Sequence, residues 1–418
     1  MPTQTEMTPR AAWLLILAAS AILMITMGAR LTTGLFMSPM HSATGLGIAS
    51  ISFALAVGQF MWGAAQPVFG AVADKYGAAR VIVLGALMLA AGLALTPFVG
   101  SQWGLMFTMG FLSAAGAGAG SFSILIGATA QRLPAARRPF AAGFINAGGS
   151  FGQFVFAPLM QLIIGSAGWV AALLTMAAAT LLTIPLAWPL RRSAGVTNAA
   201  GAPFAKPAPV PGMGLGKQIN IALRDRSYLL LHAGFFACGF HIAFLVTHLP
   251  GEVALCGLSA SVSASALALI GLFNIAGSLA AGALSTRYRM KSLLALMYAS
   301  RAVIIVIYLL APKTPMTFYV FAGALGFTWL ATVPPTAGLV GKLFGTRYLS
   351  TLFGLTLLSH QIGGFLGAWL GGLSFVRFGD YTWMWYADIV LALGAALINL
   401  PIREAHVVRT PLAAAVKA

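Results

Sequence analysis

Three charged side chains interrupt the long apolar stretches of this 418-residue chain, and they are its first candidates for chemistry. They are Arg30, Arg301 and Asp388. If those stretches cross a membrane, an ionised group at the bilayer centre costs several kcal/mol unless it faces water or a partner. Each of the three is therefore a candidate for binding a charged ligand, carrying a proton or forming a buried pair.

Arg30 is the first candidate for contact with an anion. Its guanidinium is a planar fork that matches a carboxylate, and a partly dry surrounding strengthens such a pair. It precedes Pro39, at the end of its stretch, by roughly 13 Å of helix rise. The alternative is a long side chain that reaches the membrane surface and binds nothing. We expect Arg30 to bind an anion.

Arg301 and Asp388 each leave two interpretations open. Arg301 lies near the centre of its stretch, where it either points inward to a binding site or forms a structural pair with Asp388 or with helix-end carbonyls. Asp388 lies close to the beginning of its stretch, which favours a carboxylate at the membrane surface over a proton relay.

Uncharged and titratable groups add further candidates. His241 could bind substrate or take a proton near neutral pH, or it could be a neutral, hydrogen-bonded packing residue. His360 and Gln361 lie in the middle of another stretch, where hydrogen bonds between helices are the ordinary role. Trp329 precedes the Pro334-Pro335 pair, which must disturb a helix, and could form an aromatic wall or ordinary core.

Twelve apolar stretches carry these residues. Each reaches the roughly 20 residues that a membrane-spanning helix needs. The runs are continuous, unlike the alternating strands of about ten residues in a membrane barrel, so the barrel is excluded. The sequence predicts an all-α polytopic membrane protein with twelve transmembrane helices, at 13–38, 48–72, 80–100, 104–131, 139–164, 169–190, 228–250, 261–285, 292–311, 316–341, 348–376 and 383–402.

Composition and charge exclude other classes. With 59% hydrophobic and 7% charged residues, the chain cannot cover a water-soluble domain. The net charge of +17 is spread over short gaps without an aromatic platform, so anionic lipid headgroups explain it better than nucleic acid. No phosphate-binding loop is present, and Cys238 and Cys256 form neither a disulfide framework nor a metal site. No cofactor is expected.

The basic residues also predict orientation. Twenty of them lie at the termini and in alternate gaps, whereas Lys313 and Arg377 are the two on the other side. Because basic residues near helix ends stay on the cytoplasmic side, both termini and the central loop are predicted to be cytoplasmic. The chain is therefore placed in a bacterial-type inner membrane, with many passes.

An internal repeat divides the chain into halves. Gly70-Ala71 with Lys75-Tyr76 recurs as Gly282-Ala283 with Arg287-Tyr288, and the Ala-, Pro- and Gly-rich segment between the halves is predicted to be a linker. Two six-helix halves of equal orientation imply a pseudo-twofold axis along the membrane normal and a site between them. The expected units are 1–190, a cytoplasmic linker at 191–227, and 228–418.

The gap after the second stretch carries a family resemblance. It reads Gly70-Ala-Val-Ala-Asp74-Lys75-Tyr76-Gly77-Ala-Ala-Arg80, which resembles the signature loop between helices two and three of the major facilitator superfamily. The resemblance implies that Gly70, Asp74, Lys75, Gly77 and Arg80 form a cytoplasmic gate. The alternative is that Lys75 and Arg80 only anchor the topology.

Within that superfamily, the fifth stretch resembles the monocarboxylate and oxalate/formate transporter branch. The resemblance lies in Ala147-Gly-Gly-Ser-Phe-Gly152 and the later Gly168-Trp169. One departure stands out. The branch commonly has Asn-x-x-Gly-Arg in helix eight, whereas this chain reads Asn274-Ile-Ala-Gly277-Ser278. The expected cation is missing, and Asn274 replaces an Asp that serves as proton acceptor in some members.

These observations indicate a secondary transporter, not an enzyme, that moves a small organic anion by alternating access. The resemblance favours a monocarboxylate or related carboxylate, with proton symport as the coupling and anion exchange as an option. Substrate, protons and membrane lipids are the expected partners, and the chain is expected to act as a monomer. The side chains expected at the substrate are Arg30, His241, Arg301, Trp329 and His360.

Two alternatives stay open at this point. Proton-coupled efflux of a drug or metabolite would need a titratable acid in the cavity, and the sequence offers no clear one. A membrane sensor without transport would normally carry a soluble signalling domain or a long structured tail. Only a linker and short termini lie outside the twelve stretches.

Overall fold

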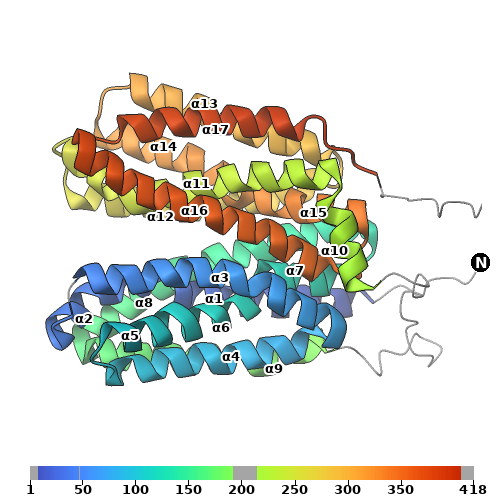
Figure 1. Cartoon of the computed structure of the whole chain (residues 1–418), viewed down its shortest axis with the longest axis horizontal. Helices are drawn as coiled ribbons and strands as arrows, with labels where there is room; N and C mark the ends of the chain where they lie inside the picture. The colour runs from blue at the N-terminus through green and yellow to red at the C-terminus, as the bar shows by residue number, and fades with distance from the viewer. Residues whose placement is uncertain (1–7, 47, 192–213, 406–418) are drawn as a thin grey trace, which may run out of the picture.

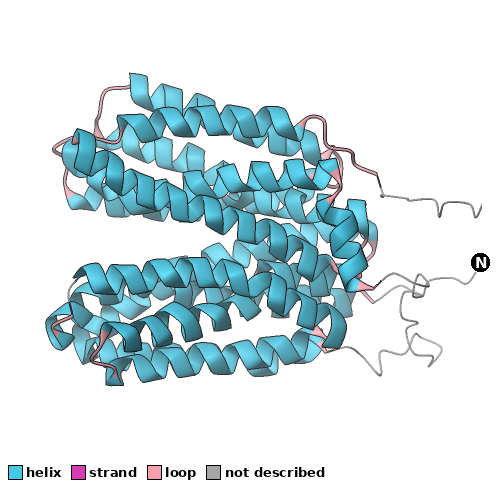
Figure 2. Ribbon diagram, in the orientation of Figure 1, coloured by secondary structure: helices cyan, strands magenta, loops and turns pink. Residues whose placement is uncertain are grey.

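The computed structural model describes residues 8–46, 48–191 and 214–405. Within these ranges the chain is helical with short connections, and no strand occurs in them (Figure 2). Residues 192–213, which make up most of the predicted linker, and the terminal residues 1–7 and 406–418 lie outside the described ranges.

The first half of the chain runs from α1 to α9. The long α8 changes direction at Gly168, whose φ of 85° is a left-handed value that glycine adopts readily, and a π-helix at Met106–Ser113 joins α5 to α6. Its helices are α1 (Pro9–Leu31), α2 (Met37–Thr44), α3 (Ile48–Tyr76), α4 (Ala78–Leu95), α5 (Gln102–Leu105), α6 (Ala114–Ala119), α7 (Phe122–Ala130), α8 (Arg138–Leu181) and α9 (Thr183–Leu186).

The second half runs from α10 to α17. The predicted linker ends in a helix, α10, in which Gln218 and Ala222 are buried, so its last part is ordered against the bundle. The helices are α10 (Leu215–Leu223), α11 (Arg226–Leu255), α12 (Ala260–Leu284), α13 (Met290–Leu310), α14 (Pro315–Thr328), α15 (Val333–Phe344), α16 (Leu349–Phe378) and α17 (Thr382–Asn399).

Helix length and hydropathy agree with a membrane location. Ten helical segments among the described residues are long and apolar enough to cross a bilayer. The 29-residue α3 and the part of α8 before Gly168 are not among these ten, but at 1.5 Å per residue both are long enough to cross. These two segments correspond to the second and fifth predicted stretches.

The helices form two bundles that lie side by side (Figure 1). The first contains α1 to α9 and the second α11 to α17, and they meet mainly through α3 against α16 and α8 against α12. Glycine allows the close approach, because a Cβ atom on Gly143 of α8 would lie 2.9 Å from the Cα of Gly282 on α12. We call the two ends of the bundles the α10 end and the α2 end, after the helices at each (Figure 1).

The tenth predicted stretch is broken in its middle. Helix α14 ends at Thr328, and a 3₁₀ turn at Leu330–Thr332 leads into α15. Pro334 has no amide hydrogen, so it cannot donate the α-helical bond to the carbonyl of Leu330, four residues earlier. Backbone carbonyls at the break therefore need other donors.

Glycines at helix crossings give the first prediction. A Cβ atom on Gly277 of α12 would lie 1.8 Å from the carbonyl oxygen of Phe327, whereas one on Gly271 of the same helix would meet nothing within 4 Å. We expect Gly277→Ala to destabilise the protein by about 1–3 kcal/mol through overpacking. Gly271→Ala, the matched control, should leave stability equal or slightly higher, because alanine is the better helix former.

Thermal unfolding of the two variants in detergent checks this prediction. A melting temperature for Gly277→Ala equal to that of Gly271→Ala would show that α12 and α14 do not pack as closely as described.

Candidate functional site

Asp74, at the end of α3, joins the two halves at the α10 end. Its Oδ2 accepts hydrogen bonds from the amide of Thr351 (2.8 Å) and from the hydroxyl of Thr351 (2.7 Å), and its Oδ1 accepts from Gln131 Nε2 (3.1 Å). Thr351 is the third residue of α16, so Asp74 caps that helix from the other half of the protein. The negative charge also faces the positive end of the α16 dipole.

Glycines permit this contact. A Cβ atom on Gly70 would lie 2.6 Å from the Ser350 carbonyl oxygen, and one on Gly127 would lie 2.2 Å from the Ser350 hydroxyl. Gly77 has a φ of 102° and separates α3 from α4. Glycine tolerates this value far better than other residues do, and the sharp turn lets α3 end directly after Asp74.

Lys75 and Arg80, the other predicted gate residues, lie differently. Both are exposed, and the Lys75 ammonium lies 4.9 Å from the centre of the Tyr76 ring. The predicted gate therefore divides into two groups. Gly70, Asp74 and Gly77 build the contact between the halves, while the two basic residues lie on the surface, as an anchoring role requires.

Arg30 lies near the end of α1 and is half buried. Its guanidinium donates a hydrogen bond to Gln59 Oε1 and lies 4.2 Å from the centre of the Trp62 ring. It lines a small cavity of about 50 Å³, together with residues of α3, α4, α6 and the π-helix. This cavity lies within the first half, so Arg30 does not face an open space between the halves.

Gln59 nevertheless connects this cavity to the second half. Gly63 follows it by one turn of α3, and a Cβ atom on Gly63 would lie 2.5 Å from the Cβ of Gln361 on α16. Because residues four apart share a helix face, Gln59 lies on the side of α3 that approaches α16. A movement between α3 and α16 would therefore shift a partner of Arg30.

Arg301 adopts the structural alternative. Its side chain, only 1% exposed, donates to the backbone carbonyls of Thr328 and Trp329 at the end of α14 and to the thiol of Cys238 (3.2 Å). The guanidinium thus supplies hydrogen bonds that the broken helix lacks. The N–H groups of Arg301 that make these bonds are therefore occupied by the protein itself, and they hold the α14–α15 break in place.

Asp388 contradicts the expectation of a carboxylate at the membrane surface. It is 0% exposed, and its Oδ2 lies 3.1 Å from Nδ1 of His241 on α11. The expectation counted residues from the helix end, but Asp388 lies on the side of α17 that packs against α11 and α13. The predicted pair between Asp388 and Arg301 is replaced by a pair with His241.

The remaining predicted residues also lie inside the second half. Trp329 is buried with its ring centre 6.3 Å from that of His241. His360 is buried against Phe235 (ring centres 4.9 Å apart) and lies 3.2 Å from Gln361 Nε2. His241, Arg301, Trp329 and His360 therefore belong to one bundle, whereas Arg30 belongs to the other.

A second set of polar bonds joins the halves through α8 and α12. Asn146 Nδ2 on α8 donates to the hydroxyl of Ser278 on α12 (2.7 Å), and Asn274 Nδ2 on α12 donates to the hydroxyl of Ser150 on α8 (2.5 Å). The two bonding residues of each helix are four positions apart, so they lie on one face of that helix. Asn274 and Ser278, which replace the ionisable residues of the resembling branch, thus serve contact between the halves.

The same asparagines reach the broken helix. The amide of Leu330 donates to Asn274 Oδ1 (2.9 Å), and its carbonyl accepts from Asn146 Nδ2 (2.9 Å). Pro334 cannot donate to this carbonyl, which accepts instead from the Val333 amide in the 3₁₀ turn and, across the halves, from Asn146. Polar residues in an apolar stretch predict such bonds in general, but not which partners they find.

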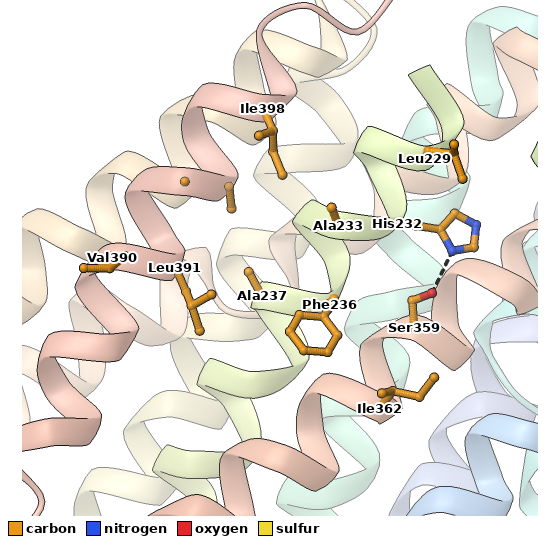
Figure 3. Close-up of a pocket in the computed structure, with 12 residues that line it drawn as sticks. Leu229, His232, Ala233, Phe236, Ala237, Ser359, Ile362, Val390, Leu391 and Ile398 are labelled. Atoms are coloured by element: carbon orange, nitrogen blue, oxygen red, sulfur yellow. Dashed lines mark hydrogen bonds between the residues drawn. The ribbon is translucent and has the colours of Figure 1, made fainter. Parts of the chain in front are cut away.

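A larger cavity, of about 660 Å³, lies between α11, α16 and α17 (Figure 3). Apolar side chains such as Leu391 and Phe236 line it, and His232 Nδ1 lies 2.7 Å from the hydroxyl of Ser359. None of the predicted substrate residues lines this groove. Exposed Val390 on its rim is typical of a surface that faces lipid.

These features define a multi-pass helical membrane protein whose two bundles are joined by polar contacts at the α10 end and between α8 and α12. Comparison with known families then identifies it. A model of the Major Facilitator Superfamily matches residues 14–368, and the chain belongs to that superfamily. It is therefore a secondary transporter and not an enzyme, which confirms the predicted class and fold.

Individual relatives agree with this assignment. Monocarboxylate transporter 13 of Rattus norvegicus is 27% identical, covering 93% of this chain and 89% of the relative. The oxalate:formate antiporter of Oxalobacter formigenes is 23% identical, covering 88% and 86%. The structure of the Escherichia coli fucose:proton symporter superposes with a TM-score of 0.71 at 15% identity, covering 92% of this chain and 97% of that one.

The Asp74 contact gives the second prediction. Asp74→Asn removes the charge and one strong acceptor, so the halves should separate more often at the α10 end. Charged hydrogen bonds contribute about 1.5–3 kcal/mol, so maleimide labelling of a cysteine at Ser350, buried in this contact, should become about tenfold faster.

The control is Asp380→Asn in the same Ser350→Cys background. Asp380 is exposed and caps the Thr382 amide (2.9 Å), a bond that asparagine can replace. Equal labelling rates in the two variants would show that Asp74 does not hold this contact closed.

Proposed function

We propose that this protein carries a small organic anion, a monocarboxylate or related carboxylate, across the inner membrane by alternating access and in symport with protons. The observation that carries the proposal is the guanidinium of Arg30. The ion pairs found among the described residues involve His241, Lys342 and Arg403, so the charge of Arg30 has no carboxylate partner there. A half-buried cation of this kind is suited to an anionic ligand.

The neighbours of Arg30 support this role. Gln59 Oε1 accepts a hydrogen bond from one N–H group of Arg30, and the Trp62 ring covers one face of the guanidinium. These contacts orient the guanidinium but do not neutralise its charge. A carboxylate could then bind to the remaining N–H groups in a two-point contact, which a lysine could not offer.

The size of the cavity requires movement. At about 50 Å³ it is smaller than the roughly 300–1,000 Å³ of ordinary ligand pockets. Substrate entry must therefore enlarge it, and the contact of α3 with α16 next to Gln59 is the nearest place to do so. Alternating access links such an opening to the rocking of the two halves.

The contacts between the halves support a cycle of this kind. Asp74 with Thr351, Asn146 with Ser278, and Asn274 with Ser150 must all separate when the α10 end opens. Neutral hydrogen bonds contribute only about 0.5–1.5 kcal/mol each, so a few of them hold one state without locking it.

The orientation of the protein in the membrane is also part of this proposal. We place the α10 end in the cytoplasm, because Lys75 and Arg80 lie there with Arg287 and Arg289 in the equivalent loop of the second half. The organic anion is chosen from the relatives, whose names specify monocarboxylates, oxalate and formate. Because one of these relatives is an antiporter, exchange of one anion for another is the alternative to proton symport.

Uptake by proteoliposomes tests the proposal and gives the third prediction. Wild-type protein should take up labelled formate, oxalate or lactate, faster with an inward proton gradient. Arg30→Gln should lower uptake about 10- to 100-fold, since it removes a charged hydrogen-bond partner contributing about 1.5–3 kcal/mol. Arg30→Lys should recover only part of it, because the two-point contact is lost.

Arg377→Gln, which removes an exposed arginine near the α2 end, is the control and should keep wild-type uptake. Wild-type uptake in the Arg30→Gln variant would remove Arg30 from the substrate site. Uptake by none of the three anions in wild-type vesicles would contradict the substrate class.

A further inference from the structure

The carboxylate of Asp388 is a poorly satisfied polar group inside the second half. Among the described residues, neither of its oxygens receives a well-formed hydrogen bond, and His241 Nδ1 at 3.1 Å is its ion-pair partner. Both side chains are buried, and Trp385 and Phe244 pack nearby with ring centres 5.1 Å apart. A bare carboxylate in such surroundings is costly.

One proton removes that cost. If neither side chain carries it, the pair has a charge of −1 in an apolar interior. With one proton on either group, the pair is neutral overall, as a neutral acid beside a neutral imidazole or as an ion pair. Charge balance in an apolar interior thus gives this buried pair a reason to bind one proton.

The other ionisable groups in the interior of this bundle come from three helices and contact one another around Arg301 and Cys238. Helix α13 contributes Arg301 and Tyr298, α11 contributes Cys238 and α16 contributes His360. Arg301 bonds to backbone carbonyls and to the Cys238 thiol, not to Asp388.

The broken helix links this pair to the contact between the halves. The ring of Trp329 lies beside His241, and the Trp329 carbonyl accepts from Arg301. The next residue, Leu330, bonds to Asn274 and, across the halves, to Asn146. A change of charge on His241 therefore acts on the segment that completes the contact with α8.

We propose that His241 and Asp388 form the proton-binding site of this transporter, buried within the second half and separate from the anion site at Arg30. This inference rests on the proposed function, because it names the site that couples protons to the anion. The proton comes from water and returns to water, and no bond to the substrate is formed. The α14–α15 break transmits the charge state to the contact between the halves.

The first test needs no substrate. A protonated imidazole quenches a neighbouring indole by accepting an electron from its excited state, so part of the tryptophan emission should fall as pH falls. The difference in emission between wild-type protein and Trp329→Phe isolates that part. We expect it to titrate in wild-type protein and to be absent in His241→Gln. A pH-independent difference in wild-type protein would show that His241 takes no proton, and would overturn a site shared by His241 and Asp388.

The second test measures coupling and gives the fourth prediction. Asp388→Asn keeps the shape of the side chain but cannot release a proton. In proteoliposomes it should exchange labelled for unlabelled formate within about twofold of the wild-type rate, yet lose accumulation driven by a proton gradient and the accompanying proton uptake reported by pyranine. Asp380→Asn, an exposed acid near the same helix, should keep both.

The outcomes separate the two proposals. Gradient-driven accumulation in Asp388→Asn would overturn the proton site while leaving anion transport intact. Loss of exchange together with accumulation would assign the pair a structural role and would likewise overturn it. If wild-type vesicles move none of the carboxylates, the substrate proposal fails, and the fluorescence titration alone decides whether the pair binds a proton.

Discussion

A backbone carbonyl that loses its usual α-helical donor needs another one in the interior of a membrane protein, and the break between α14 and α15 creates this need. Arg301 serves two, at Thr328 and Trp329, and Asn146 of the other half serves Leu330. The positions of these side chains follow from that need. The same break places Trp329 against His241. The need for hydrogen-bond donors at the end of α14 thus also determines how polar side chains are arranged inside the second bundle.

The contacts between the halves change in chemical character along the interface. At the α10 end the contact is electrostatic, between the Asp74 carboxylate and the beginning of α16. Nearer the middle it consists of neutral amides and hydroxyls on α8 and α12. Ion pairs at mid-membrane would cost more to desolvate and to separate, so the neutral set is better suited to repeated opening. Ser278, where the resembling branch has arginine, fits this pattern.

Much of the fold could be predicted from the sequence, because apolar length and the alternation of charged gaps reflect the bilayer directly. Of the predicted gate residues, Gly70 and Asp74 lie in the contact with α16, and their role in gating stays a prediction. What failed was the direction of single side chains. Asp388 was assigned to the surface by counting residues, yet rotation about the helix axis and cover by neighbours put it in the interior. Helix-end carbonyls were one of the alternatives expected for Arg301, but nothing local to this residue indicates that they belong to the helix that follows it.

The clamp on the broken helix also bears on how the chain enters the membrane. Arg301 belongs to α13, while the carbonyls it serves are 27 and 28 residues further along the chain. When α13 leaves the ribosome and meets the lipid, Cys238 is the one of its partners already synthesised. If α13 entered the lipid alone, the charge of Arg301 would lack the carbonyl partners that stabilise it in the folded protein. Biogenesis of the second half is therefore expected to proceed by insertion of α13 and α14 as a hairpin, with α13 held beside the translocation machinery until its successor arrives.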